Sequence, residues 1–283
     1  MRDLLANDET KLSIKLKIFY AVIITICVVS LIAAIVIQIN KDNKVPTEKP
    51  STSTEETDNT AKEEFYEMFT NKVNYMENNS YKIVKNEEDR EIIYTGYRKK
   101  ENKINDYEID VSIPYININN EKITEFNDKI KDIFEKKAKN VLNTKDGNII
   151  YTVNYSAYIT NNILSLVVRS TLKEGTNPQR EIVQTYNYDL TNQKEYTIQD
   201  VLKYKGITKQ EANEAIKAEI KKVQESVKKL EGLGYNIYSR DPESDVYNIN
   251  NVTEFFIGKD DKLYIVYAYG NENNTSEMDI VTM

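Results

Sequence analysis

Histidine and tryptophan are absent from this sequence of 283 residues, and cysteine occurs once. Without histidine, the chain cannot form a Ser-His-Asp or Cys-His nucleophile system, and it lacks one of the usual zinc ligands. A single cysteine excludes a disulfide within the chain. We therefore expect no catalytic residues, no metal site and no cofactor, and we do not expect an enzyme.

Glycine and proline are scarce, and the eight glycines form neither the G-x-x-x-x-G-K-[ST] nor the G-x-G-x-x-G phosphate-binding motif. The composition, 40% hydrophobic and 29% charged, is that of a globular protein. It excludes collagen, disorder throughout and a multi-span membrane protein. The formal charge of −7 argues against nucleic acid as the main partner.

One apolar run stands out, IFYAVIITICVVSLIAAIVI at residues 18–37. A helix of about 20 uncharged residues spans roughly 30 Å, the thickness of the hydrocarbon core of a membrane. A cleaved signal peptide would have an apolar region of only about 7–15 residues followed by a small-x-small site, and neither is found here. We predict a transmembrane signal anchor over residues 18–38.

The basic residues that flank this run favour an inside location for the N-terminus. The N-terminal side has one basic residue more than the other side, as shown by Arg2, Lys11, Lys15 and Lys17 against Lys41, Lys44 and Lys49. We expect a cytoplasmic tail at 1–17, a disordered stalk at 39–62 and an extracytoplasmic domain at 63–283, in a single-pass protein of the bacterial cell membrane. The stalk sequence has two prolines and almost no large apolar residues.

Helical periodicity appears in three parts of this domain. From about residue 61, apolar residues recur at Phe65, Phe69, Val73 and Met76. A second helix is expected at 121–142, with one apolar face formed by Ile123, Phe126, Ile130, Phe134, Ala138 and Val141. A third is expected to begin with a capping box at Thr208 and Glu211 and to end near Leu230, before two glycines.

Strands occupy most of the remaining sequence. They are expected at about 81–84, 91–98 and 106–116, in a hairpin that turns at Asn161-Asn162, in the following segment REIVQTYNYDL, in a C-terminal hairpin around the turn KDD, and at 278–282. Hairpin connections dominate. We therefore predict an α+β fold, a mainly antiparallel sheet packed with two to three helices, in one body or in two lobes divided near 190–206.

Four residues are candidates for ligand binding. They are Arg169, Arg180, which is the last residue of the loop GTNPQR at 175–180, and Tyr267 and Tyr269, which share one face of the last long strand while Tyr264 lies on the other. Ordinary sheet packing is the alternative interpretation. The S-x-x-K string at Ser170–Lys173 is not expected to be catalytic, because residues three apart on a strand point to opposite faces.

Several strings in residues 106–283 resemble the RsiV-like extracytoplasmic domain. They are SIPYININNEKITEFNDKI, NNILSLVVRSTL, QTYNYDLTNQKEYTIQDVL and TEFFIGKDDKLYIVYAYG. This family includes membrane-anchored anti-sigma factors that sense lysozyme, and its domain also precedes the catalytic domain of certain peptidoglycan deacetylases. The resemblance implies a cell-envelope binding domain. The N-terminal tail of about seventeen residues is shorter than the sigma-binding region of the family.

We therefore expect a non-enzymatic sensor that binds a basic protein such as lysozyme, or a cell-wall component, outside the cell. The first forty residues carry four basic and three acidic side chains, so the remainder carries a formal charge of −8, which suits a basic partner. A sigma factor is a further candidate partner for the tail. The alternatives are an enzyme or accessory protein that modifies peptidoglycan through carboxylates, which the 45 acidic residues leave open, and a structural protein without a soluble ligand.

Overall fold

Two β-sheets and several α-helices form an α+β fold in the computed structural model, which describes residues 60–76, 78–234, 237–271 and 274–283. These residues all belong to one compact unit, Glu55–Met283. The predicted tail, the span at 18–38 and the stalk up to residue 59 lie outside the described residues. Among the helices that are described, none is long and apolar enough to cross a membrane.

The larger sheet, sheet A, has the order β2-β3-β4-β5-β6-β7, with β1 also paired to β4. Its strands are β1 (Lys72–Tyr75), β2 (Ile93–Lys103), β3 (Tyr107–Ile116), β4 (Ile149–Thr160), β5 (Ile163–Glu174), β6 (Arg180–Asp189) and β7 (Lys194–Glu195). Sheet B has the order β10-β9-β8, from β8 (Phe255–Ile257), β9 (Leu263–Asn271) and β10 (Asn274–Thr282). The helices are α2 (Thr60–Glu67), α3 (Glu121–Ile130), α4 (Lys136–Leu142), α5 (Ile198–Lys205) and α6 (Lys209–Glu231).

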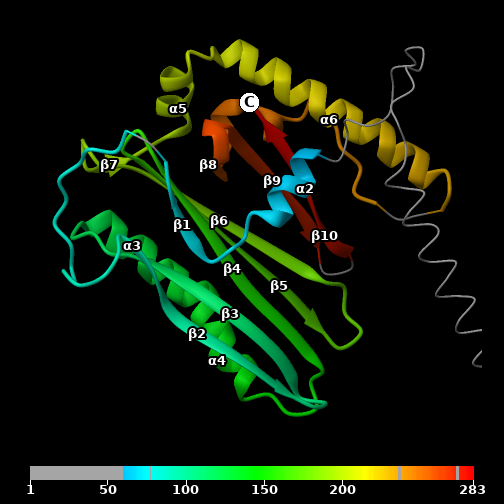
Figure 1. The fold of residues 1–283 in the computed structure, drawn as a ribbon. Helices are drawn as coiled ribbons and strands as arrows, with labels where there is room; N and C mark the ends of the chain where they lie inside the picture. The colour runs from blue at the N-terminus through cyan, green and yellow to red at the C-terminus, as the bar shows by residue number, and fades with distance from the viewer. Residues whose placement is uncertain (1–59, 77, 235–236, 272–273) are drawn as a thin grey trace, which may run out of the picture. The chain divides into compact units, whose positions relative to one another are not determined.

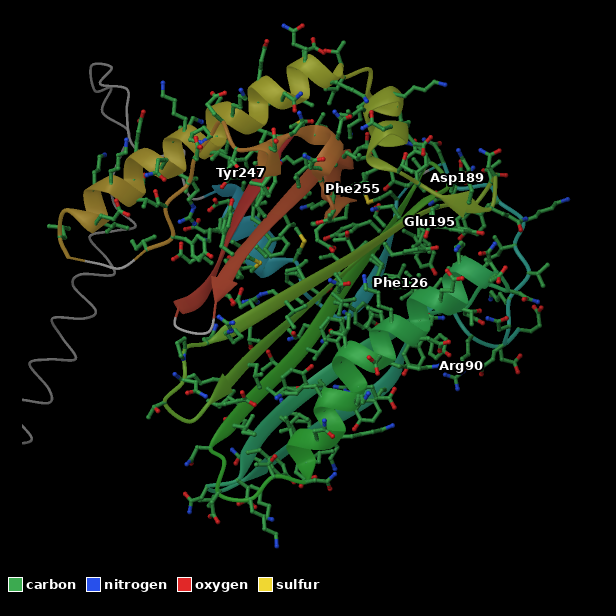
Figure 2. All side chains as sticks on the ribbon, turned by 180° about the vertical axis from the view of Figure 1, so that it is seen from behind. Arg90, Phe126, Asp189, Glu195, Tyr247 and Phe255 are labelled. Atoms are coloured by element: carbon green, nitrogen blue, oxygen red, sulfur yellow. The ribbon has the colours of Figure 1, made fainter. Side chains whose placement is uncertain are left out.

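The elements stack in layers (Figure 1). Helices α3 and α4 cover one face of sheet A, sheet B and α2 cover part of the other face, and α5 and α6 cover the outer face of sheet B. Figure 2 shows the same layers from behind, with Phe126 of α3 in the lower layer and Tyr247 and Phe255 in the upper layers. The Phe126 ring stacks on Tyr186 of β6 at a centroid distance of 4.4 Å.

Strand pleating distributes the apolar residues among the layers. Along β9, Tyr264 and Val266 face sheet A, whereas Ile265 and Tyr267 face α5 and α6. This alternation follows because successive side chains of a strand point to opposite faces. It confirms the prediction that Tyr267 and Tyr264 lie on opposite faces.

The mainly antiparallel sheet is confirmed, with two parallel exceptions on β4. The first half of β4 pairs in parallel with β3, and its second half pairs in parallel with β1. Parallel pairing of consecutive strands requires a crossover, which α3 and α4 provide. The six apolar residues predicted to form one face of a helix over 121–142 lie in this crossover and are all buried. The predicted asparagine turn at Asn161-Asn162 is also confirmed, with positive φ at both positions.

Two local predictions are wrong. The helix that begins near residue 60 ends at Glu67, and Val73 and Met76 belong to β1 or follow it. Despite its helical spacing of apolar residues, this segment is extended because its backbone pairs with β4. The Asn71 amide donates to the Tyr155 carbonyl, and the Met76 amide donates to the Ile159 carbonyl. Residues 81–84 form no strand. The short helix α5 was also not predicted, although Thr197 and Asp200 form a capping box at its start.

Polar side chains of sheet A form hydrogen bonds with the backbone of β8. Asn187 donates to the Phe255 carbonyl (2.7 Å), Ser165 donates to Asn187 (2.6 Å), and Ser165 accepts from the Ile257 amide (3.1 Å). Ser165 and Asn187 are buried. Buried polar groups are tolerated when they are hydrogen-bonded, so this set explains why two polar residues lie between the sheets.

Glu254 reinforces the same junction and makes stability depend on pH. Its carboxylate accepts hydrogen bonds from the amide (2.7 Å) and the hydroxyl (2.9 Å) of Thr185. Burial nevertheless raises the pKa of Glu254 above its ordinary value. A raised pKa in the folded state means that stability is greatest while the carboxyl is protonated, and falls as the pH rises from the ordinary pKa of about 4.3 through the raised pKa.

We therefore expect Glu254→Gln, which keeps a neutral acceptor, to remove this part of the pH dependence. The measurement is urea unfolding of the full-length protein in detergent micelles between about pH 4 and 8. The stability of the native protein relative to the variant should decline as the pH rises. A difference that stays constant, or that grows in favour of the native protein, would contradict the assignment.

Candidate functional site

The structure places Arg169 near the middle of β5 and Arg180 at the start of the neighbouring strand β6. Arg169, on β5, pairs with Glu181 (Nη2–Oε1 2.7 Å), and its guanidinium lies 4.4 Å from the ring centroid of Tyr66. Burial raises the pKa of Tyr66 to about 12. Arg180 is the first residue of β6 and is half-buried. Arg169 is thus engaged by an anion and an aromatic ring.

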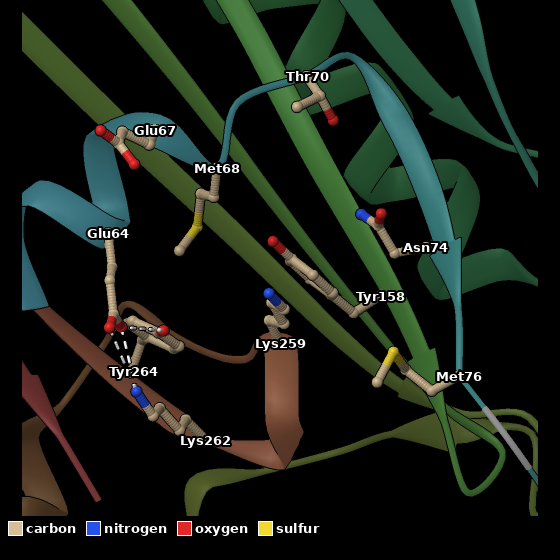
Figure 3. A pocket seen from close by; sticks show the side chains of 10 residues that line it. All are labelled: Glu64, Glu67, Met68, Thr70, Asn74, Met76, Tyr158, Lys259, Lys262 and Tyr264. Carbon is tan, nitrogen blue, oxygen red and sulfur yellow. Dashed lines mark hydrogen bonds and ion pairs between the residues drawn. The ribbon is translucent and has the colours of Figure 1, made fainter. Parts of the chain in front are cut away.

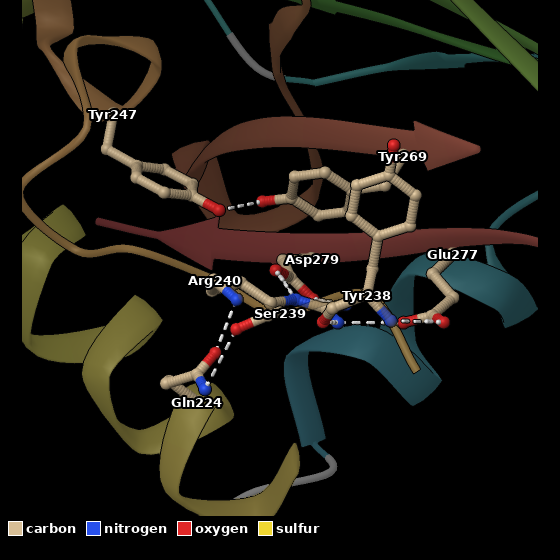
Figure 4. Close-up of polar contacts among 8 residues, drawn as sticks. All are labelled: Gln224, Tyr238, Ser239, Arg240, Tyr247, Tyr269, Glu277 and Asp279. Carbon is tan, nitrogen blue, oxygen red and sulfur yellow. Dashed lines mark hydrogen bonds and ion pairs between the residues drawn. The ribbon is translucent and has the colours of Figure 1, made fainter. Parts of the chain in front are cut away.

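Tyr267 and Tyr269 lie in a different part of the molecule, between sheet B and α6; Figure 4 shows Tyr269 beside Tyr247. Tyr267 is buried and contacts Tyr247 edge to face at a centroid distance of 5.0 Å. The Tyr269 hydroxyl is hydrogen-bonded to the Tyr247 hydroxyl at 2.7 Å. The structure therefore does not bring the two arginines and the two tyrosines together.

The ring of Tyr269 covers a buried ionic cluster centred on Arg240, whose guanidinium carbon is 4.8 Å from the ring centroid. Arg240 pairs through two nitrogens with Asp279 (3.0 Å each) and through Nη1 with Glu277 (2.8 Å). Its backbone amide donates to Gln224 of α6. The cluster fixes the segment after α6 against β10, and every strong donor in it has an acceptor, which indicates a structural role.

An exposed charged segment lies at residues 86–91, with the sequence NEEDRE, which we call the acidic loop. All six residues are exposed. The loop is anchored by Asn117, a buried residue whose side chain accepts from the amides of Asn86 (3.1 Å) and Glu87 (2.9 Å) and donates to the Glu87 carbonyl (2.7 Å). These bonds hold the backbone at the start of the loop in place, and with it the positions from which the carboxylates extend.

Tyrosines flank the acidic loop. Tyr75 of β1, half of whose surface is exposed, donates to Glu91 at 2.8 Å, and Tyr94 of β2 donates to Glu87 at 3.2 Å. Arg90 pairs with Glu87 (2.6 Å) and lies over the Tyr94 ring, 4.4 Å from its centroid. Burial and the neighbouring glutamates raise the pKa of both tyrosines, which therefore remain hydrogen-bond donors at neutral pH. Figure 2 shows Arg90 next to α3.

A cavity of about 440 Å³ lies on the other face of β1 (Figure 3). It is bounded by α2, β1, β4 and the turn between β8 and β9. Met68, Met76 and Tyr158 form apolar walls, and the polar lining includes Glu64, Glu67, Thr70, Asn74, Lys259, Lys262 and Tyr264. The size is within the range of small-molecule sites.

Glu64 is the best-connected charge of this cavity. Its Oε2 is 3.1 Å from Lys262 Nζ and 3.2 Å from the Tyr264 hydroxyl. The bond from Lys262, and to a lesser extent the one from Tyr264, lowers the pKa of Glu64 despite some burial. A glycosidase needs a carboxyl with a raised pKa as its general acid, and Glu64 is the opposite case. The direction of this shift disfavours Glu64 as a general acid.

The residues of the acidic loop and of the cavity were not predicted as site residues. Residues 85–91 are recognisable in the sequence as a charged stretch, KNEEDRE, but nothing in the sequence indicates that Asn117 anchors the loop. The cavity combines segments up to 200 positions apart in the sequence, which no local pattern could reveal. Among the described residues, no group of three or more His, Cys, Asp or Glu side chains is placed to hold a metal ion.

No protein-family model matches the chain, and no curated protein shows significant similarity to it.

Proposed function

We propose that residues 63–283 are the extracytoplasmic recognition domain of a single-pass bacterial membrane protein, and that the domain binds a basic protein such as lysozyme. The observation that carries the proposal is the acidic loop, four carboxylates and one arginine held in place by Asn117. Exposed carboxylates attract a basic partner and accelerate its association. A pre-organised loop loses little conformational entropy on binding.

The flanking tyrosines support recognition of a protein surface. Tyr75 and Tyr94 supply large rigid rings with polar tips, and tyrosine is among the residue types enriched in protein-binding surfaces. The apolar run at 18–37 and the resemblance to the RsiV-like domain support the membrane anchor and the location outside the cell. On this basis we propose membership of that family.

We test the proposal by neutralising the loop. In the full-length protein held in detergent micelles, the combined substitution Glu88→Gln, Asp89→Asn and Glu91→Gln should weaken lysozyme binding at least tenfold, because it removes three of the four carboxylates that face the partner. Raising the salt concentration from about 50 to 300 mM should weaken binding by the native protein and have a smaller effect on the variant.

The matched control makes the same change of charge on α6, with Glu214→Gln, Glu225→Gln and Glu231→Gln, all at exposed positions. This control should bind almost like the native protein. Equal weakening by both triple variants would show that only net charge matters, and no weakening by either would exclude the acidic loop as the binding surface.

A more specific form of the proposal is that the protein is an anti-sigma factor, in which residues 1–17 bind the sigma factor. Deleting these residues should then derepress a sigma-dependent set of genes in cells that express the protein. Unchanged transcription would reject this output and would leave recognition by the domain untouched. Turnover of purified muropeptides by the protein would instead favour the alternative of a peptidoglycan-modifying enzyme.

A further inference from the structure

The two faces of β1 serve different surfaces. Val73 packs against the core beneath α3, and Tyr75 on the same side reaches the acidic loop. Asn74 and Met76 point the other way and line the cavity beside α2 (Figure 3). The cavity is therefore separate from the proposed protein-binding surface, and its chemistry can be considered independently.

Lys259 is the positively charged residue of the cavity that is available to pair with a ligand. Figure 3 shows its ammonium group directed into the space between Met68, Met76 and Tyr158. Lys262, the second cation, is already paired with Glu64. Among the described side chains, Lys259 has no ion-pair partner. The site therefore offers one ammonium group next to an apolar wall, which suits a ligand with a single negative charge and a small apolar body.

The anionic and amide groups of the cavity restrict the ligand further. Glu64 repels a dianion such as a phosphate, yet its carboxylate has acceptor sites beyond the two that Lys262 and Tyr264 occupy. The Asn74 amide nitrogen donates to the Ala157 carbonyl (3.1 Å), which leaves the amide oxygen available as an acceptor. A ligand that combines a carboxylate with nearby N–H donors matches this set better than a fatty acid does.

We propose that this cavity binds the carboxyl-terminal end of a short peptide with small apolar side chains. Its carboxylate pairs with Lys259, its side chains contact Met68, Met76 and Tyr158, and its N–H groups donate to Glu64 and Asn74. Such an end occurs in two sources, the stem peptides of the cell wall, which terminate in D-residues, and the C-termini of proteins, which terminate in L-residues.

The chain provides its own reporters for the test. Of its five methionines, Met68 and Met76 line the cavity, whereas Met278 and Met283 do not, and Met283 packs in the separate cluster between sheet B and α6. The full-length protein labelled at its methionine methyl groups, in detergent micelles, is titrated with N-acetyl-D-Ala-D-Ala, with N-acetyl-L-Ala-L-Ala and with the amide of each. The methyl signals of Met68 and Met76 should shift saturably with a dissociation constant of about 1 mM.

The carboxylate should be essential. We expect each amide to bind at least tenfold more weakly than its acid, and Lys259→Gln to weaken the acid by the same factor, since a charge-assisted hydrogen bond is lost. Lys259→Arg should restore binding, and Lys203→Gln, at an exposed position on α5, should change nothing. A preference for the D,D or the L,L probe distinguishes the two sources.

Three results would overturn the proposal: no shift of the Met68 and Met76 signals up to about 10 mM probe, equal binding of acid and amide, or normal binding by Lys259→Gln. The Lys259 variants should leave lysozyme binding intact, and the acidic-loop variant should leave peptide binding intact. Failure of this site is therefore distinguishable from failure of the proposed protein recognition.

Discussion

Replacement of Arg240 by methionine should lower the free energy of unfolding by about 3–5 kcal/mol, the largest effect that we expect from a single substitution in the domain. The side chain of Arg240 is 2% exposed and that of Asp279 is 4% exposed. Methionine fills the volume of the guanidinium stem but leaves the Asp279 carboxylate buried without its cation. Glu277 also loses its partner, at a position nearer to solvent.

Urea unfolding of the full-length protein in detergent micelles, followed by near-ultraviolet circular dichroism of the tyrosines, measures this effect. Replacing both partners, with Arg240→Met and Asp279→Leu, should recover part of the loss, because no buried charge then remains unpaired at Asp279. Arg98→Met, at an exposed position on β2, should stay within about 0.5 kcal/mol of the native protein. A loss below about 1 kcal/mol for Arg240→Met would contradict the buried cluster.

Asn187→Leu should have the second largest effect, a loss of about 2–4 kcal/mol. The substitution removes the donor to the Phe255 carbonyl and the acceptor for the Ser165 hydroxyl. Each buried polar group left without a partner costs roughly 1–3 kcal/mol. Because these bonds join β8 to sheet A, sheet B should also separate from sheet A more easily.

Amide hydrogen exchange detects that separation. In the variant, the amides of Phe255 and Ile257 should exchange faster than in the native protein, while the amides of the β4–β5 hairpin remain protected. The control Asn140→Leu changes an exposed asparagine on α4 and should not affect β8. Uniformly faster exchange across both sheets, or no change at β8, would show that Asn187 does not join them.

Elements with strong local signals could be predicted from the sequence. The helix over 121–142, the asparagine turn of the β4–β5 hairpin, the capping box of α6 and the C-terminal hairpin all follow from short-range patterns, and the structure confirms them. In each, residues within four positions of one another decide the conformation. The fold class followed from the same hairpins.

Features that depend on distant segments could not be predicted. The apolar residues Val73 and Met76 fit a helical period, but the segment forms a strand because it pairs with β4, about 80 positions away. The acidic loop appeared only as a charged stretch, because the role of Asn117 depends on contacts some 30 positions apart. Arg240 carried no local signal, since both of its carboxylate partners lie on β10.

The proposed functions divide between two surfaces of one domain. The acidic loop is presented on the α3 side of β1, and the cavity with Lys259 opens on the side of α2 and sheet B. Alternating residues of a single four-residue strand contribute to both. A surface for a basic protein and a site for a peptide end are therefore built from the same short element without sharing a side chain.

Binding of the full-length protein in detergent micelles to lysozyme, and to insoluble peptidoglycan, at low and high salt tests the central claim most directly. We predict saturable binding of lysozyme that weakens between about 50 and 300 mM salt, as expected for recognition steered by the acidic loop. Lysozyme binding that does not respond to salt, or binding to neither lysozyme nor peptidoglycan, would contradict it.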